Sequence, residues 1–424
     1  MKSSTSEGTI TPAVFQAEIS GIEIKTQPTK MDYSFGETLD LSGLVITVHY
    51  EGTDDTKEVA WSADSGIIAD PANGTALYAS QHNGKPVTIT YEGKTATTSA
   101  LTVGKADQTG FAFTGEPYRA VACGDEPFAV EATGGQGNGT VTYAVTEGQD
   151  VVSVSVSTVT ILKSGTATIT ATKAADEDYN EATATLVVYV TPKQVDGVYQ
   201  IGTANDLFWF AGLVNGTLEN VEQDTAASAV LTADIDLSGE TWTPIGSEST
   251  PYIGTFDGQG YTISGMTIEN AESYSGLFGN VTGTVKNFTV TGSITITGDE
   301  TVARVGGAVG SLGTASAGGT VSGVTSGVDI TVSAGNDHFG GVVGSMPENS
   351  SPTVENCIYT GKITVTVAAG SVAGIVGYIR TGTIQNCANQ GSISVDVGGT
   401  GSVGGILGYC NNGGIYIRNC YNTG

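Results

Sequence analysis

A glycine-rich stretch recurs five times in the C-terminal half of the chain and limits the possible folds more than any other feature. Its copies occupy residues 275–279, 306–310, 340–344, 373–377 and 404–408, and their last glycines are 31, 34, 33 and 31 residues apart. A second anchor glycine recurs in parallel, at Gly292, Gly327, Gly361, Gly391 and Gly424. Two independent anchors that share a period of about 32 residues predict a repeat array.

Each period has room for three short strands separated by turns. The first is the apolar glycine-rich stretch, the second surrounds an Asn-Cys pair, and the third alternates apolar and hydroxyl residues, as in "SITIT" or "KITVT". Three short strands and three turns per period predict one coil of a parallel β-solenoid. Equivalent residues of successive coils then lie about one strand spacing apart, roughly 4.8 Å.

The Asn-Cys pairs predict two columns at one corner of this solenoid. The inward column is a structural core ladder made of Phe288, Cys357, Cys387 and Cys420, with Gly323 or Val324 in the second coil. The asparagines form a turn ladder, amide to amide, at Asn287, Asn356, Asn386 and Asn419. A zinc site needs converging ligands, and the three histidines are scattered through the chain, so we expect no metal and no cofactor.

Upstream of the repeats, alternating strands and turn signals predict an all-β chain with two Ig-like β-sandwiches before the solenoid. The expected domains are a linker or tail at 1–17, sandwiches at 18–104 and 105–191, and a β-solenoid at 192–424 that is truncated at its C-terminus. A capping-box pattern, with Thr203 three residues before Asp206, starts an apolar helical period. This predicts a helix at about 203–216, which caps the first coil of the solenoid.

Two resemblances follow from these motifs. The stretches "KTQPTKMDYSFGETLDLSGLVITVHYEG" and "GTATITATKAADEDYNEATATLVVYV" resemble bacterial Ig-like domains over residues 18–191. The motif "AGIVGYI" followed by "TIQNCANQG" is similar to the GLUG repeat of bacterial surface proteins, over residues 196–424. The resemblance implies a secreted or wall-attached surface protein of Gram-positive bacteria. The sequence has no "HExxH", so the resemblance does not bring the peptidase domain found in some GLUG proteins.

The charge distribution excludes several partners. The net charge is -27, and residues 301–424 hold five acidic and four basic residues, so nearly all of the excess lies in residues 1–300. Such an acidic surface repels nucleic acid and anionic lipid. No run of 18 apolar residues occurs, so we expect no membrane insertion. The opening has no apolar signal-peptide core, so we expect a fragment whose export signal and anchor lie elsewhere in a longer chain. We also expect this fragment to be a monomer.

The third strand of each coil supplies the candidate ligand-contact face. With Ile and Val inward, its outward residues form two hydroxyl-rich columns: Thr295, Thr331, Thr364, Ser394, and Thr297, Ser333, Thr366, Asp396. We expect adhesion or binding to a host glycan or host protein, or a simple stalk. An ice-binding solenoid and a carbohydrate-active β-helix enzyme remain alternatives. The carboxylates that an enzyme needs do not recur in a column, so we expect no catalysis.

The cysteine pattern gives a prediction that needs only a thiol reagent. Three of the five cysteines belong to one buried column and the total is odd, so folding should require no disulfide. A free-thiol assay on denatured, unreduced protein should show most thiols to be reactive. A count of one would contradict the ladder.

Overall fold

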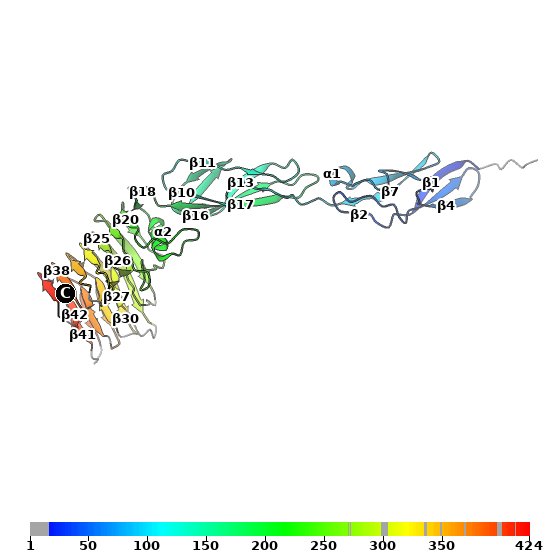
Figure 1. Cartoon of the computed structure of the whole chain (residues 1–424). Coiled ribbons are helices and arrows are strands. Elements are labelled where there is room, and N and C mark those ends of the chain that lie inside the picture. The colour runs from blue at the N-terminus through cyan, green and yellow to red at the C-terminus, as the bar shows by residue number, and fades with distance from the viewer. Residues whose placement is uncertain are drawn as a thin grey trace, which may run out of the picture. The chain divides into compact units, whose positions relative to one another are not determined.

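The structure is a computed structural model of the chain. It describes residues 17–269, 271, 273–297, 304–334, 337–347, 350–368, 370–396, 401–411 and 413–424. Apart from Ala17, the predicted tail lies outside the described residues. Regular structure is almost entirely strand (Figure 1), so the predicted all-β class is confirmed. No described helix has the length and apolar character needed to cross a membrane.

The described chain forms two compact units. One contains residues up to 117 together with 130–144 and 170–185, and the other contains 118–129, 145–169 and 186–424. The first sandwich lies within the first unit, the solenoid lies within the second, and strands of residues 105–191 belong to both. The predicted boundaries near residues 104 and 191 therefore stay predictions.

The first sandwich is built from short antiparallel sheets. Strands β1, β3 and β4 form one sheet, β5, β6 and β7 form another, and β2 pairs in parallel with β8. Their bounds are β1 Ile19–Thr26, β2 Asp32–Tyr33, β3 Val45–Tyr50, β4 Thr56–Ala60, β5 Ile68–Asp70, β6 Pro86–Tyr91, β7 Lys94–Ala100 and β8 Thr102–Val103. Alternating residues such as Ile46 and Val48 are fully buried in its core. The sequence did not predict the one-turn helix α1, Ala79–His82.

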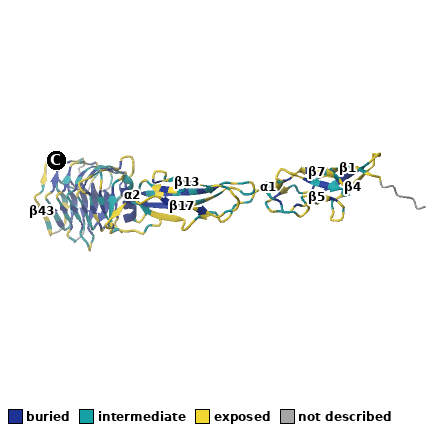
Figure 2. Ribbon diagram, turned by 90° about the horizontal axis from the view of Figure 1, so that it is seen from above, coloured by how far each residue is buried: buried dark blue, intermediate teal, exposed yellow. Residues whose placement is uncertain are grey.

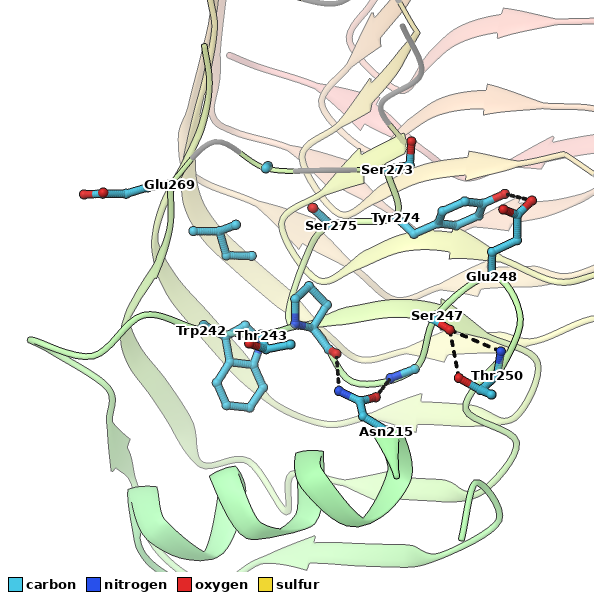
Figure 3. Close-up of a pocket in the computed structure, with 14 residues that line it drawn as sticks. Asn215, Trp242, Thr243, Ser247, Glu248, Thr250, Glu269, Ser273, Tyr274 and Ser275 are labelled. Carbon is cyan, nitrogen blue, oxygen red and sulfur yellow. Dashed lines mark hydrogen bonds between the residues drawn. The ribbon is translucent and has the colours of Figure 1, made fainter. Parts of the chain in front are cut away.

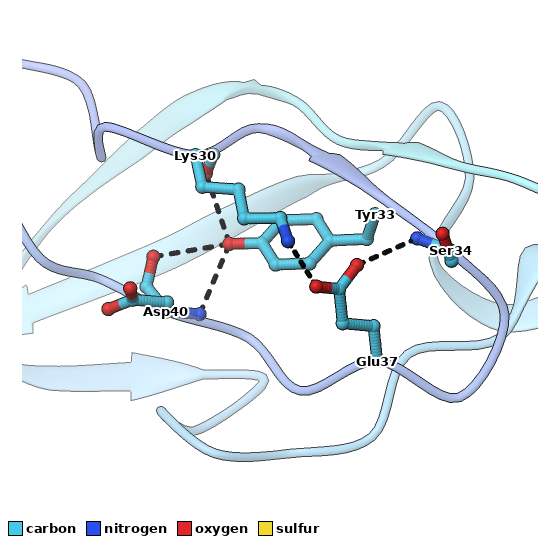
Figure 4. A network of polar contacts seen from close by, with 5 residues as sticks. All are labelled: Lys30, Tyr33, Ser34, Glu37 and Asp40. Atoms are coloured by element: carbon cyan, nitrogen blue, oxygen red, sulfur yellow. Dashed lines mark hydrogen bonds and ion pairs between the residues drawn. The ribbon is translucent and has the colours of Figure 1, made fainter.

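A polar network at Tyr33 stabilises one end of this sandwich (Figure 4). The buried Tyr33 hydroxyl lies 3.0 Å from the carbonyl oxygen of Lys30 and accepts a hydrogen bond from the Asp40 amide at 3.1 Å. The Lys30 ammonium pairs with Glu37, whose other carboxylate oxygen accepts from the Ser34 amide at 2.9 Å. The hydrogen bond from Lys30, followed by that from Ser34, lowers the pKa of Glu37.

The second sandwich also consists of short strands. Within it, β9 pairs with β12, and β15 pairs with β11 and β14, all antiparallel, while β10 runs parallel to β17. The bounds are β9 Ala112–Phe113, β10 Tyr118–Ala122, β11 Phe128–Ala129, β12 Ala132–Thr133, β13 Val141–Glu147, β14 Val152–Ser155, β15 Thr158–Ile161, β16 Gly165–Lys173 and β17 Ala182–Thr191.

The C-terminal part is a parallel β-solenoid of about six turns, as predicted. Its four sheets run along the stack, and Figure 2 shows that its interior is buried. The first is the β18–β43 sheet, which is parallel except where β18 turns back on β19: β18 Gln194–Val195, β19 Val198–Ile201, β20 Ser228–Leu231, β22 Thr255–Asp257, β25 Thr284–Lys286, β29 Thr320–Ser322, β33 Thr353–Glu355, β38 Gly382–Gln385 and β43 Ile415–Arg418.

The other three sheets are parallel throughout. The β21–β44 sheet contains β21 Ile235–Asp236, β23 Thr262–Ile268, β26 Thr289–Ile296, β30 Thr325–Val332, β34 Ile358–Tyr359, β35 Lys362–Val365, β39 Ala388–Asn389, β40 Ser392–Val395 and β44 Tyr421–Asn422. The β24–β42 sheet contains β24 Phe278–Val281, β28 Val309–Leu312, β32 Val343–Met346, β37 Val376–Ile379 and β42 Leu407–Cys410. The β27–β41 sheet contains β27 Arg304–Gly306, β31 His338–Gly340, β36 Ser371–Ala373 and β41 Ser402–Gly404.

The prediction of three strands per coil was wrong, because the glycine-rich stretch is a corner between two strands. Strand β27 ends at Gly306 and β28 begins at Val309, so the chain bends between them. A Cβ atom on Gly306 would overlap the carbonyl oxygen of Val309, and one on Gly340 would overlap that of Val343. The repeated glycines therefore allow two sheets to meet at a narrow corner.

The Asn-Cys pairs also lie at a corner and not within a strand. Asn356, Asn386 and Asn419 have φ values of 54°, 53° and 52°, in the left-handed region, where asparagine is better tolerated than most residues. The Asn386 side-chain amide donates to Asn356 Oδ1 at 3.2 Å, and that of Asn419 donates to Asn386 Oδ1 at 3.2 Å. Asn287 departs from the ladder, because Gly323 fills the next rung and the Asn287 amide donates to Asp257.

The predicted helix is α2, Ala204–Asn215, and it has the predicted capping box. Thr203 and Asp206 exchange hydrogen bonds at the N-terminus, and Gly216 in a left-handed conformation ends the helix. Its apolar face begins the solenoid core, where Phe210 lies beside Tyr252 and Phe256. Ring contacts continue to Phe278 and Phe288, so aromatic side chains fill the first coils.

The asparagine ladder can be tested with two substitutions at one rung. Asn386→Gly keeps the left-handed backbone but removes both amide hydrogen bonds, and it should lower the free energy of local opening by about 1 kcal/mol. Asn386→Ala also strains the backbone and should cost about 2 kcal/mol. Hydrogen exchange of peptides covering residues 376–395, in the full chain, measures both. Equal effects would show that the left-handed turn is not what selects asparagine.

Candidate functional site

The candidate contact face is the outward side of strands β26, β30, β35 and β40. Backbone pairing places Thr295, Thr331, Thr364 and Ser394 in one register. The isoleucines between them point into the core, with Ile294 and Ile330 buried. Thr331 and Ser394 are exposed, and Thr295 and Thr364 are half-buried. Among the described residues, nothing hydrogen-bonds to these four hydroxyls, which therefore face solvent as a row with about 4.8 Å between rungs.

The second predicted column lies beside the first, but two of its hydroxyls are hydrogen-bonded to the backbone. It contains Thr297, Ser333, Thr366 and Asp396. The Ser333 hydroxyl donates to the Ile296 carbonyl oxygen at 3.0 Å, and the Thr366 hydroxyl donates to that of Val332 at 3.3 Å. These two hydroxyls bond to the preceding coil, so they are less available to a ligand than those of the first column.

The column on the other side of the first is mixed in charge. Ser293, Asp329, Lys362 and Ser392 occupy equivalent positions. The Asp329 carboxylate accepts a hydrogen bond from the Lys362 backbone amide at 2.8 Å. The acid thus supports the strand start of the next coil, and the face combines neutral hydroxyls with a charged border.

A longer hydroxyl column, not predicted from the sequence, lies on the β18–β43 sheet. Its residues are Ser228, Thr255, Thr284, Thr320, Thr353 and Thr383. The recurring threonine, apolar, polar triplet of "TFD", "TVK", "TVS", "TVE" and "TIQ" could have revealed it. The polar column beside it is cross-linked, since Glu355 accepts from Ser322 at 3.1 Å and from Gln385 at 2.8 Å.

A cavity of about 420 Å³ is lined by Asn215 at the end of α2 and by residues between Trp242 and Thr250 and between Ile268 and Ser275 (Figure 3). Its polar groups are largely bonded to one another. The Asn215 amide donates to the Pro244 carbonyl oxygen at 2.9 Å and accepts from the Gly246 amide at 2.8 Å. The Ser247 and Thr250 hydroxyls lie 2.8 Å apart. This pattern is typical of a structural joint.

Tyr274 is the centre of a second network at the rim of this cavity. Its hydroxyl donates to Glu248 Oε1 at 2.6 Å and accepts from Arg304 Nη1 at 2.8 Å. Burial, together with the hydrogen bond to Glu248, raises the pKa of Tyr274 to about 12. The neutral phenol therefore belongs to the folded state and joins two segments of the first coils.

The inward column at the Asn-Cys corner contains one residue from each of five coils. The register aligns Phe288, Val324, Cys357, Cys387 and Cys420, and Val324 fills the second coil. Cys357 and Cys387 are fully buried, and Cys420 is partly exposed. Burial raises the pKa of Cys357 well above that of an ordinary thiol. All five cysteines of the chain are free.

A serine, a histidine and an aspartate meet on the β27–β41 sheet. His338 Nδ1 lies 2.7 Å from the Ser371 hydroxyl, and its Nε2 lies 2.8 Å from Asp337. The His338 ring also stacks on Tyr378, with 4.2 Å between ring centroids. Ser371 is completely buried, so its hydroxyl cannot reach a substrate, and the trio serves to join coils.

The acidic segment 175–181 shows a structural use for one of its carboxylates. Asp176 accepts hydrogen bonds from the amides of Asn138 at 2.7 Å, Tyr179 at 2.8 Å and Asp178 at 3.0 Å. These bonds, led by that from Asn138, lower the pKa of Asp176. Among the described residues, no three His, Cys, Asp or Glu side chains converge as a metal site.

Comparison with known proteins gives limited matches, and no protein-family model matches the chain. Halomucin of Haloquadratum walsbyi is 32% identical over 146 residues, which are 32% of this chain and only 2% of halomucin. The N-terminal four Ig domains of Dscam1 match at TM-score 0.21 and 14% identity, over 40% of this chain and 46% of theirs. Domains 4 and 5 of the S-layer protein SbsC match at TM-score 0.15 and 15% identity, over 41% of this chain and all of theirs. No functional residue is taken from these proteins.

The Tyr274 network predicts a specific alkaline sensitivity. Because the folded pKa is raised above the ordinary value of 10.0, this phenol contributes stability that is complete below pH 10 and is lost as the pH rises towards 12. Urea unfolding at pH 8 to 11, followed by Trp209 and Trp242 fluorescence in a Trp61→Phe background, should show a steeper loss with Tyr274 than with Tyr274→Phe. Parallel pH profiles for the two proteins would contradict this assignment.

Proposed function

We propose that the chain is part of a non-catalytic surface protein of bacteria, exposed to the extracellular space, whose solenoid carries GLUG-type repeats and contacts a host glycan or host protein. The observation that carries the proposal is the row formed by Thr295, Thr331, Thr364 and Ser394, whose hydroxyls are in register and without partners among the described residues. The sandwiches act as the stalk that presents this face.

The chemistry of the row suits a polar, uncharged ligand. Each hydroxyl can donate one hydrogen bond and accept two, which matches the needs of sugar hydroxyls and of peptide backbone groups. Residues 301–424 are close to neutral, with five acidic and four basic residues. A ligand can therefore approach this face with little loss of hydration around charges, in contrast to the strongly acidic N-terminal part.

Two alternatives are less well supported by the same face. Ice binding favours a uniform array of hydroxyls, whereas Asp329 and Lys362 border the row. A carbohydrate-active enzyme needs two carboxylates across a substrate cleft. The recurring outward residues of this face are hydroxyls, and Asp329 is engaged by the Lys362 amide.

The experiment is a binding screen of the full chain on glycan and host-protein arrays, followed by two matched triple variants. Thr295→Lys, Thr331→Lys and Thr364→Lys together should weaken binding of any ligand found by at least about tenfold, because lysines replace hydroxyls within the row. The control carries Thr284→Lys, Thr320→Lys and Thr353→Lys, which adds equal charge on the other sheet, and it should bind as the unmodified chain does.

Melting temperatures of both variants should stay close to that of the unmodified chain, since the substituted residues are at least partly exposed. If the control loses binding and the first variant keeps it, the contact face is the longer column on the β18–β43 sheet. Equal binding by all three proteins would show that the solenoid is a spacer.

A further inference from the structure

The column of cysteine side chains places pairs of thiols at a fixed separation inside the solenoid. In each of three successive coils, the cysteine Sγ donates to the carbonyl oxygen two residues earlier, at 3.1 Å for Cys357 and 3.2 Å for Cys387 and Cys420. Each Sγ also lies 3.7–3.8 Å from an equivalent carbonyl oxygen in the preceding coil. The same contacts in every coil mean that the three side chains share one orientation.

Side chains that share one orientation repeat with the spacing of the strands. Neighbouring strands lie about 4.8 Å apart, so successive Sγ atoms are separated by about that distance. Backbone pairing before and after the cysteines holds this separation. Glu355 pairs with Gln385 on one side of Cys387, and Ile358 pairs with Ala388 on the other. The Asn356, Asn386 and Asn419 amides fix the adjacent turn.

A separation of about 4.8 Å between two Sγ atoms fits a cation that is bound by two thiolates. A metal–thiolate bond is about 2.3 Å long, so a cation with two thiolates on opposite sides spans about 4.6 Å. Zinc requires four ligands, and the described residues provide no third or fourth side chain here. Copper(I) is a soft cation that thiolates select, and it accepts two ligands in a line.

We propose that Cys387 and Cys420 bind one soft monovalent cation of the copper(I) class, which bridges two successive coils. The pair is chosen because the Cys387 backbone amide donates to Cys420 Sγ at 3.5 Å, a hydrogen bond that helps to stabilise a thiolate there. Each thiol that ligates as a thiolate releases one proton to solvent, and the copper remains Cu(I), so no oxidant or reductant takes part.

The inference does not depend on the proposed adhesive function, because the thiols lie in the core and the hydroxyl row lies on the outer surface. Binding would connect the coil that contains Cys420 to the coil before it. A cation bound by the folded form alone shifts the folding equilibrium towards that form. The site therefore has a structural readout in addition to binding itself.

The test uses the full chain in a Cys123→Ser, Cys410→Ser background, which leaves only the column. Anaerobic titration with Cu(I), against bicinchoninate as the coloured competing chelator, should give one ion per chain. Adding Cys387→Ser or Cys420→Ser should weaken binding at least about tenfold. Adding Cys357→Ser, a substitution in the same column but outside the pair, should leave the affinity unchanged.

Hydrogen exchange gives the second readout. Cu(I) should increase the protection of peptides within residues 413–424 in the background protein and leave it unchanged in Cys420→Ser, which alters only a partly exposed position and should fold normally. Three ions per chain, an affinity independent of Cys387 and Cys420, or equal affinity in 8 M urea would overturn the proposal. Equal affinity in 8 M urea would mean that two thiols of an unfolded chain bind Cu(I) as well as the folded pair does.

Discussion

Hydrogen bonding between coils in parallel register is the interaction on which the solenoid depends. Once Thr289 pairs with Thr325 and Thr325 pairs with Ile358, every other residue of those strands has its neighbour assigned. Side chains alternate between the two faces, so a slip of one residue would move each buried Ile or Val of β30 to the outside. The hydroxyl rows, the asparagine ladder and the thiol column are therefore consequences of one register.

The corners keep that register. At one corner, paired glycines let two sheets approach, because a Cβ atom on Gly306 would overlap the carbonyl oxygen of Val309. At another, the left-handed asparagines turn the chain and bond to the coil before. The two kinds of corner are needed because a strand cannot bend sharply without either removing a side chain or adopting a left-handed residue.

Much of this could be predicted from the sequence, because a period near 32 residues is visible in the glycines and the Asn-Cys pairs. The capping box at Thr203 and Asp206 and the in-register row at Thr295 and Thr331 were predicted for the same reason, since each has a local pattern. The sequence predicts a strand for the glycine-rich stretch because its apolar residues hide the bend. The threonines at 284, 320 and 353 repeat with the same spacing as Thr295, Thr331 and Thr364, but each stands in a triplet too short to show an alternating pattern. The network at Tyr33 lies outside the repeats, and that at Tyr274 joins residues that do not recur from coil to coil, so no periodicity points to either.

The equivalence of the coils has a consequence for how such a chain can change over generations. A deletion or duplication that spans one whole period joins positions that already occupy the same place in the fold, as Gly344 of β32 and Gly377 of β37 do in adjacent coils. Every retained strand then finds the same type of neighbour as before, and the turn chemistry is unchanged. Recombination between neighbouring repeats can thus shorten or lengthen the array by whole coils, and with it the extent of the exposed hydroxyl rows, without a new folding solution. A shift of one residue has no such route, because it exchanges the inner and outer faces. Copy number is the trait that selection can adjust most freely in this part of the protein.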